Sequence, residues 1–381
     1  MRILLRFLVV FVMLAVGMGT ANSAEKILIG FTPPVTGASA SEGALQIKAI
    51  NLALKQINAA GGVNGKKIDL ITVDNQSSNP GALAALQRAV EQEKVLAVVS
   101  VVKSTQVLAT SEAIKNYGIP TFTGGTNATI TKQGNPWLFR VRPDDSIAAA
   151  AMVKYIKEYA KLTKVGILND TDAFGSGGAD LVEQYCKESG LTVVKRVRFS
   201  TKEKDFTTLL LSLKNAGAQV MVVYAPNPED VAVIQRQYRQ LGSPFKYIGS
   251  PSSQMRDCLN LSKEAAEGIW AIADVVPGST AENRRYGVDY RKEYNEEFDA
   301  TSAWAYDSLY ILANTIKKVG ENREKIREAI LKIKGYKGVL GTYNFTPNGD
   351  GLHSVCVVEI KNNKPELLKI IDVGPGPGGT K

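Results

Sequence analysis

The sequence predicts an α/β fold with two doubly wound, Rossmann-like lobes, and three observations support this prediction. The chain has 381 residues, whereas a single hydrophobic core rarely serves more than about 250–300. Short apolar runs alternate with amphipathic segments, which is typical of βα units around a mainly parallel sheet. The alternation begins again with the apolar run at 165–168, so we expect a second lobe built like the first.

Residues 1–24 have the pattern of a signal peptide. Two arginines form a basic start, and an apolar run follows at 7–16. This run is too short to span a bilayer. Small residues come next, and cleavage is expected after Ala21 or Ala24. The sequence therefore predicts an exported protein.

The first lobe is expected to begin with a strand, an amphipathic helix and a glycine-rich turn. Ile47, Ile50 and Leu54 recur at three- and four-residue steps, as on one apolar helix face. Gly61 and Gly62 end that helix and lead the chain into the next strand. Strands are predicted at 27–31, 68–73, 96–101, 120–123 and 138–141, and helices at 43–59, 80–92, 105–116 and 147–160.

The second block repeats this alternation and then becomes mainly helical. Strands are predicted at 165–168, 191–198, 220–224, 247–249 and 268–273, and helices at 176–189, 206–216 and 229–241. After about residue 275, helices are predicted at 284–296, 303–319 and 323–333, followed by β segments at 339–345 and 354–360. The last ten residues, 372–381, are rich in glycine and proline and are expected to be mobile.

The composition argues against several classes of function. The 46 Lys and Arg residues against 37 Asp and Glu give a formal charge of +9, but the excess is scattered, so no nucleic-acid partner is expected. The single histidine, His353, has no nucleophile motif beside it, and no Walker loop or dinucleotide fingerprint occurs. We therefore expect no enzyme, cofactor or metal site. Cys186, Cys258 and Cys356 are far apart in sequence and are expected to be unpaired and buried.

Two hydroxyl-bearing loops follow neighbouring predicted strands. Gly124, Gly125 and Thr126 come directly after one short strand, and Ser104 follows the apolar strand before it. Ligands of parallel sheets bind outside the carboxyl ends of the strands. Glycines allow the backbone to approach a small solute closely. These loops therefore predict a site for a carboxylate, against the alternative of ordinary hydroxyl-rich loops.

Several motifs, in order along nearly the whole chain, resemble the leucine/isoleucine/valine-binding family of periplasmic solute receptors. The resemblance is carried by Thr36-Gly37, Asn58-Ala-Ala-Gly-Gly-Val-Asn-Gly-Lys-Lys-Ile, Gly118-Ile-Pro, Lys204-Asp-Phe-Thr-Thr-Leu and Trp304-Ala-Tyr-Asp. The Asn58 element is the most specific of these.

The resemblance implies a type I periplasmic binding protein fold, with a three-crossover hinge and the ligand in the cleft between the lobes. It implies lobe bounds of 25–143 plus 275–351 and of 144–274 plus 352–381. In the family a serine and a Gly-Thr loop hold the ligand carboxylate, and these correspond to Ser104 and 124–126. The implied partners are a small carboxylate or amino-acid ligand and the membrane permease subunits of an ABC importer. A periplasmic monomer without a cofactor is expected.

The other half of the predicted site departs from the family pattern. Amino-acid binders of this family carry an acidic residue after the strand at 247–249, but Ser250 and Pro251 stand there in this chain. A buried, unpaired ligand ammonium is costly. Another acid must therefore replace the missing one, or the ligand lacks the amine. The candidate replacements are Glu42, expected in a loop, and Asp172.

Further residues of this half are also unusual. Phe174 stands where relatives often carry tyrosine and is expected to pack on the ligand, with Tyr224 and Pro226 nearby. The family disulfide is missing, because Ser78 and Lys103 stand about where its cysteines would be. Lys103 either adds positive charge beside the ligand carboxylate or faces solvent.

Two questions stay open at this point. The ligand is either an aliphatic amino acid or an amine-free organic or aromatic acid. The function is that of a transport receptor, with a receptor for a chemoreceptor or kinase as the alternative and an exported α/β enzyme as the weakest one.

Overall fold

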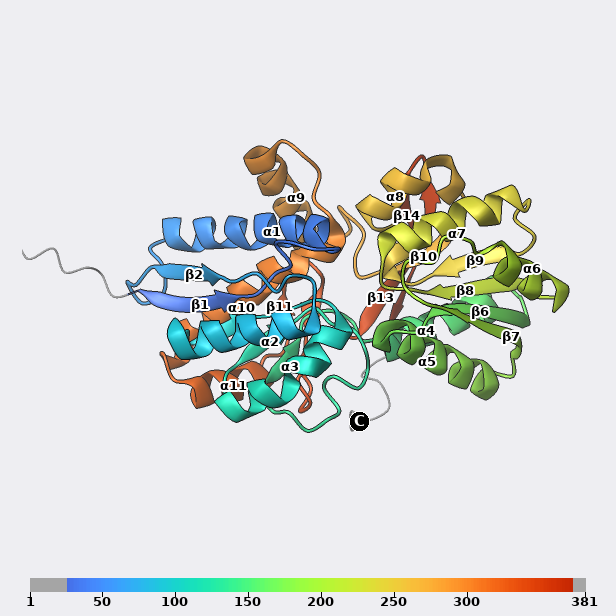
Figure 1. Ribbon diagram of the computed structural model, residues 1–381. Helices are drawn as coiled ribbons and strands as arrows, with labels where there is room; N and C mark the ends of the chain where they lie inside the picture. The colour runs from blue at the N-terminus through green and yellow to red at the C-terminus, as the bar shows by residue number, and fades with distance from the viewer. Residues whose placement is uncertain (1–25, 373–381) are drawn as a thin grey trace, which may run out of the picture.

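The computed structural model describes residues 26–372, which form two α/β lobes that lie side by side (Figure 1). The predicted signal peptide lies outside the described residues, and so does the glycine- and proline-rich tail after Asp372. In the described part of the chain, no helix combines the length and apolarity that crossing a membrane requires.

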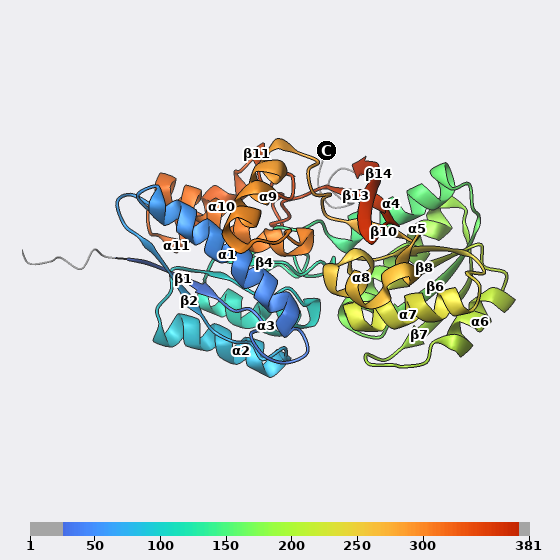
Figure 2. The same ribbon diagram turned by 90° about the horizontal axis from the view of Figure 1, so that it is seen from above.

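The first lobe is built on a parallel sheet with the strand order β2-β1-β3-β4-β5. Its apolar residues form one cluster with α1, α9, α10 and α11 and another with α2 and α3, so helices cover both sheet faces (Figures 1 and 2). The elements are β1 (Ile27–Phe31), α1 (Ala40–Ala59), β2 (Ile68–Thr72), α2 (Asn79–Gln87, continued by a π-helical turn at Arg88–Gln92), β3 (Ala97–Val99), α3 (Ser104–Tyr117), β4 (Thr121–Thr123), β5 (Leu138–Arg140), α9 (Ala281–Tyr294), α10 (Ala303–Val319), α11 (Arg323–Leu331) and the short hairpin β11 (Tyr336–Lys337) and β12 (Thr342–Tyr343).

The second lobe is built on a sheet with the order β14-β13-β10-β9-β8-β6-β7. Strands β6 to β10 are parallel, whereas β13 and β14 are antiparallel additions at one edge. Helices α4 and α5 cover one face, and α6, α7 and α8 cover the other. The elements are α4 (Asp145–Lys154, continued by a π-helical turn at Tyr155–Tyr159), β6 (Lys164–Asp170), α5 (Ala173–Ser189), β7 (Thr192–Phe199), α6 (Thr207–Asn215), β8 (Val220–Tyr224), α7 (Pro228–Gln240), β9 (Lys246–Gly249), α8 (Arg256–Ser262), β10 (Trp270–Ala273), β13 (Ser354–Lys361) and β14 (Lys364–Asp372).

The glycine-rich turn after α1 is closed by the side chain of Asn58. Its amide nitrogen donates to the Ile68 carbonyl, and its amide oxygen accepts from the Ile68 N–H, both at 2.9 Å. Gly62 has φ +76°, and a Cβ there would lie 2.0 Å from the Lys66 carbonyl oxygen. The turn therefore needs both the asparagine and the glycine to bring β2 beside β1.

The chain crosses between the lobes three times, and buried ion pairs join these crossings. Arg140, at the end of β5, contacts Asp350 of the third crossing at 2.7 Å. Arg142, on the first crossing, contacts Asp274 of the second at 2.5 Å. Both guanidinium groups are buried, so each acid is needed to neutralise its partner.

The structure corrects several expected elements. Helix α5 begins at Ala173 and not at 176, because the Asp172 carboxylate caps it by accepting from the Gly175 N–H at 2.7 Å. Strand β14 was not predicted, since its exposed edge position gives it no clean apolar alternation. The segment at 251–262, for which no helix was predicted, forms a 3₁₀ turn and α8. The β segment predicted at 339–345 is reduced to β12.

The prediction that the cysteines are unpaired and buried is confirmed for Cys186, Cys258 and Cys356. Cys258 lies in α8, a helix that was not predicted. The Nε2 atom of His353, the single histidine, lies 2.8 Å from the Asn344 carbonyl oxygen, which gives this side chain a structural contact.

Candidate functional site

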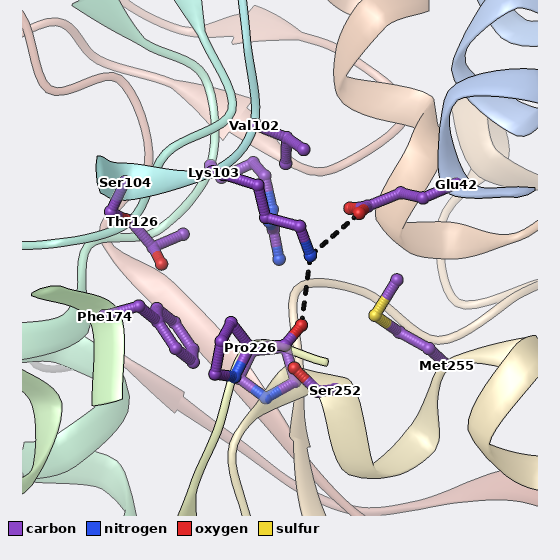
Figure 3. Close-up of a pocket in the computed structure, with 11 residues that line it drawn as sticks. Glu42, Val102, Lys103, Ser104, Thr126, Phe174, Pro226, Ser252 and Met255 are labelled. Carbon is purple, nitrogen blue, oxygen red and sulfur yellow. Dashed lines mark hydrogen bonds and ion pairs between the residues drawn. The ribbon is translucent and has the colours of Figure 1, made fainter. Parts of the chain in front are cut away.

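A pocket lies between the two lobes, and both lobes supply its walls (Figure 3). It includes most of the residues predicted from the sequence. The first lobe contributes Glu42, Val102, Lys103, Ser104, Thr126 and Arg142, and the second contributes Phe174, Pro226, Pro251, Ser252 and Met255.

Two hydroxyl-bearing side chains lie on one wall of the pocket. Ser104 is the first residue of α3, and its Oγ accepts from the Asn127 N–H at 3.2 Å. This leaves the Ser104 O–H proton for another acceptor. Thr126 lines the same pocket and, like Ser104, is buried. Because the N-terminus of a helix carries a partial positive charge, this wall suits a carboxylate.

The two predicted glycines lie behind this wall and position it. The Gly124 N–H donates to the Val101 carbonyl at 3.3 Å, and the Gly125 N–H donates to Thr123 Oγ1 at 3.1 Å. A Cβ on Gly124 would lie 2.7 Å from the Trp304 ring. Close packing therefore explains these glycines better than contact with a solute.

A buried arginine, Arg140, holds the loop that carries Thr126. One Nη of Arg140 donates to the carbonyls of Thr126 and Asn127 at 2.9 and 2.7 Å. The loop that carries the Thr126 side chain is thereby tied to the end of β5. The positions of these carbonyls depend on a residue that does not line the pocket.

Lys103 and Glu42 form an ion pair inside the pocket. The Lys103 Nζ lies 3.0 Å from Glu42 Oε2 and donates to the Pro226 carbonyl at 3.1 Å. The two side chains are only 18% and 12% exposed, so Lys103 does not face solvent. We had expected Glu42 in a loop, but it lies in the first turn of α1. Figure 3 shows the Lys103 ammonium between Glu42 and Pro226.

Arg142 is a second cation on the pocket wall, and sequence reasoning missed it. Its Nε and one Nη donate to the two Asp274 oxygens at 2.5 and 3.3 Å, and its other Nη donates to the Gly124 carbonyl at 3.2 Å. Its position at the first crossing between the lobes was the available signal, since a charged residue there lies beside the cleft.

Two aromatic side chains, Phe174 and Tyr224, pack one behind the other. Phe174 lines the pocket, and Tyr224 packs behind it with ring centroids 5.0 Å apart. The Tyr224 hydroxyl donates to Asp145 Oδ1 at 3.0 Å. A Cβ on Gly178 would lie 2.1 Å from the Tyr224 ring. Tyr224, which we had expected near the ligand, thus supports Phe174 and does not itself line the pocket.

Asp172 and Ser250 also lie beside the pocket, outside its lining. The Asp172 carboxylate caps α5, and burial is the main cause that raises its pKa. The Ser250 hydroxyl lies 3.3 Å from the Ala225 carbonyl oxygen and joins the loops after β8 and β9. Pro251 lines the pocket and offers no charge. Val102, Ser252 and Met255, which also line it, carry no sequence signal that separates them from ordinary loop residues.

Asp145 is a buried acid at the start of α4. Burial raises its pKa to about 7, while the hydrogen bond from Tyr224 lowers it. The nearby Asp144 raises this pKa, and Arg140 lowers it. The Oδ2 atom of Asp145 is buried without a hydrogen-bond partner, which is consistent with a carboxyl group that is partly protonated near neutral pH.

Hydrogen bonds join the lobes around the pocket. The Asn127 amide donates to the Ala173 carbonyl at 2.5 Å, and the Ser41 hydroxyl donates to Asp257 Oδ2 at 2.5 Å. Lys103 bonds to Pro226 in the same way. These three contacts join the two halves of the pocket.

Comparison with known proteins agrees with this architecture. A family model described as periplasmic binding protein matches residues 26–365. The leucine-, isoleucine-, valine-, threonine-, and alanine-binding protein of Pseudomonas aeruginosa is 27% identical over 331 residues, which cover 86% of this chain and 88% of that protein. The leucine-binding protein LivK from Thermotoga maritima is 27% identical, with a TM-score of 0.85 over 91% of this chain and 99% of that structure.

A solute-binding protein of an ABC transporter from R. palustris, solved with benzoate, shares the fold at 18% identity. Its TM-score is 0.83, and the match covers 93% of this chain and 99% of that structure. The predicted two-lobed α/β fold and the predicted resemblance are both confirmed. The chain belongs to the periplasmic binding protein family.

Proposed function

We propose that this chain is the solute receptor of an ABC importer and that it binds a small carboxylate-bearing ligand between its lobes. One observation carries the proposal. The Ser104 and Thr126 side chains line the pocket at the N-terminus of α3, beside the cations of Lys103 and Arg142. A carboxylate at this wall would accept hydrogen bonds from both hydroxyl groups.

The ligand would act by favouring the closed arrangement of the lobes. We propose that 25–143 plus 275–351 and 144–274 plus 352–381 move as the two bodies, about the three crossings. A ligand that contacts both walls is bound more strongly by the closed form, and it shifts the population by that difference in affinity. The membrane permease would then recognise the closed form.

Removing both hydroxyl groups tests the carboxylate wall. A hydrogen bond to a charged group contributes about 1.5–3 kcal/mol, so the Ser104→Ala, Thr126→Ala double variant should bind at least about a hundredfold more weakly. Isothermal titration calorimetry with a carboxylate found by thermal shift measures this loss. The control is a Thr192→Ala, Ser279→Ala double variant, which removes two exposed hydroxyl-bearing side chains. An unchanged dissociation constant in the first variant contradicts the assignment.

A further inference from the structure

We propose that Lys103 supplies the ammonium group of this pocket, so that the ligand is a carboxylic acid without an amine. The inference rests on the proposed function and concerns the same pocket. It assigns a substrate class, amine-free carboxylates, and makes Lys103 the residue that determines it.

The contacts of Lys103 are those that a ligand ammonium would need. Its Nζ lies 3.0 Å from a carboxylate of the first lobe, Glu42, and 3.1 Å from a carbonyl of the second, Pro226. An ammonium group inside a pocket requires an opposite charge and further acceptors. Figure 3 shows both partners turned toward the Lys103 nitrogen. The side chain therefore occupies the place where an amino group would be neutralised.

The pocket offers no second acid for an amine. Glu42 is the only carboxylate among the described residues that line it. Asp172 is taken up by the cap of α5, and Asp145 lies behind the wall with Tyr224. Pro251 is uncharged. A ligand ammonium would have to compete with Lys103 for Glu42, and Lys103 is covalently held at its position.

The charge of the walls points to the same class. The pocket presents two cations, Lys103 and Arg142, and one anion, Glu42. Arg142 is also neutralised from behind by Asp274. A carboxylate brought into this pocket can approach either cation, whereas an ammonium can approach only Glu42, which Lys103 already neutralises. An amino acid would gain from its carboxylate, but its ammonium would find no free acid in the pocket.

Lys103 acts within the first lobe before any closure. It precedes α3 as the N-cap residue, and Glu42 lies in the first turn of α1, so both members of the pair belong to the same lobe. Only the bond to Pro226 crosses the cleft. Both charges of the pair thus come from one lobe, so forming the pair does not require a residue of the other lobe.

Matched pairs of ligands test the inference on the mature protein after removal of co-purified ligand. The pairs are leucine with 4-methyl-2-oxopentanoate, and phenylalanine with phenylpyruvate and 3-phenylpropanoate. Thermal shift finds the binders, and calorimetry gives their dissociation constants. The expected result is that an amine-free acid binds about tenfold or more tightly than the amino acid of its pair.

Two variants assign the effect to Lys103. Lys103→Met keeps the aliphatic stem and removes the charge, so it leaves Glu42 free to neutralise a ligand ammonium. We expect the preference to reverse, with an amino acid gaining about tenfold or more in affinity. Adding Glu42→Gln to Lys103→Met should abolish that gain. Glu42→Gln alone removes a negative charge from the pocket and should strengthen binding of the amine-free acid, whereas it would weaken an amino-acid ligand.

The outcomes separate this inference from the proposed function. The role of Lys103 is contradicted if the wild-type protein prefers the amino acid of a pair and Glu42→Gln abolishes that binding. The receptor function would still stand. Binding of no carboxylate of either class overturns the proposed function and the inference with it. A thermal melt of each variant verifies folding, and Glu42→Gln supplies the decision if Lys103→Met does not fold.

Discussion

Replacing Arg140 by methionine should lower the free energy of unfolding by about 3–5 kcal/mol, since it leaves buried acids without a counter-charge. Arg140 is fully buried and contacts Asp350 at 2.7 Å, with Asp144 at 3.9 Å. It also donates to Thr131 Oγ1 at 2.6 Å. The variant therefore removes one cation and strands several acceptors at once. Ligand binding should weaken as well, because Arg140 holds the carbonyl of Thr126.

Urea denaturation followed by circular dichroism measures this loss. Arg291→Met serves as the matched control, because Arg291 and its partner Glu297 are both exposed and surface ion pairs of this kind contribute little to stability. Adding Asp350→Asn to Arg140→Met should recover part of the stability, since the stranded charge is then gone. If Arg140→Met costs no more than the Arg291 variant, the buried pair does not hold the crossings together.

The pH dependence of stability should run against the usual direction for an acid, because of Asp145. Burial raises its pKa from 3.8 to about 7, so the folded protein keeps a proton that the unfolded chain releases between these values. The contribution of Asp145 is therefore fully present below about pH 4 and is lost as the pH rises through about 7. One pKa unit corresponds to about 1.4 kcal/mol, so the loss amounts to a few kcal/mol.

Asp145→Asn should remove this dependence. The amide stays neutral at every pH and still accepts a hydrogen bond from Tyr224, so the variant should be more stable than the wild type at pH 8 and similar at pH 4. Denaturation curves at several pH values compare the two. Some slope should remain, because burial also raises the pKa of Asp307 to about 6. A variant that is less stable than the wild type at pH 8 contradicts the role assigned to Asp145.

The alternation of apolar runs and amphipathic helices was enough to predict the α/β fold, because that pattern is local. The Asn58 turn was predictable for the same reason: its hydrogen bonds join residues that are ten apart. Strand β14 lies at an exposed edge, where burial imposes no alternation, and was missed. The start of α5 was misplaced because its capping residue, Asp172, had been assigned to the ligand.

The candidate site was predicted in two ways, from loops at the strand ends and from the family resemblance, which pointed to Glu42, Phe174 and Pro251. Ser104 and Thr126 could be found because each comes directly after a strand of one sheet. The pairing of Lys103 with Glu42 joins residues 61 positions apart, and the sequence carries no local trace of it. Arg142 is buried because two crossings meet at Asp274, a contact that depends on the completed fold.

The hydrogen bonds from Lys103 to Pro226 and from Asn127 to Ala173 join protein groups of the two lobes. They therefore stabilise the closed arrangement of the lobes whether or not a ligand is bound. Each such bond contributes about 0.5–1.5 kcal/mol. A receptor with such hydrogen bonds is partly closed even without ligand, and its apparent affinity for the ligand rises with the fraction of closed molecules. In the proposed receptor function, that closed fraction would meet the membrane permease without a bound ligand. Stronger hydrogen bonds between the lobes would therefore raise sensitivity at low ligand concentration, but they would also raise the number of unproductive contacts of ligand-free receptor with the proposed permease.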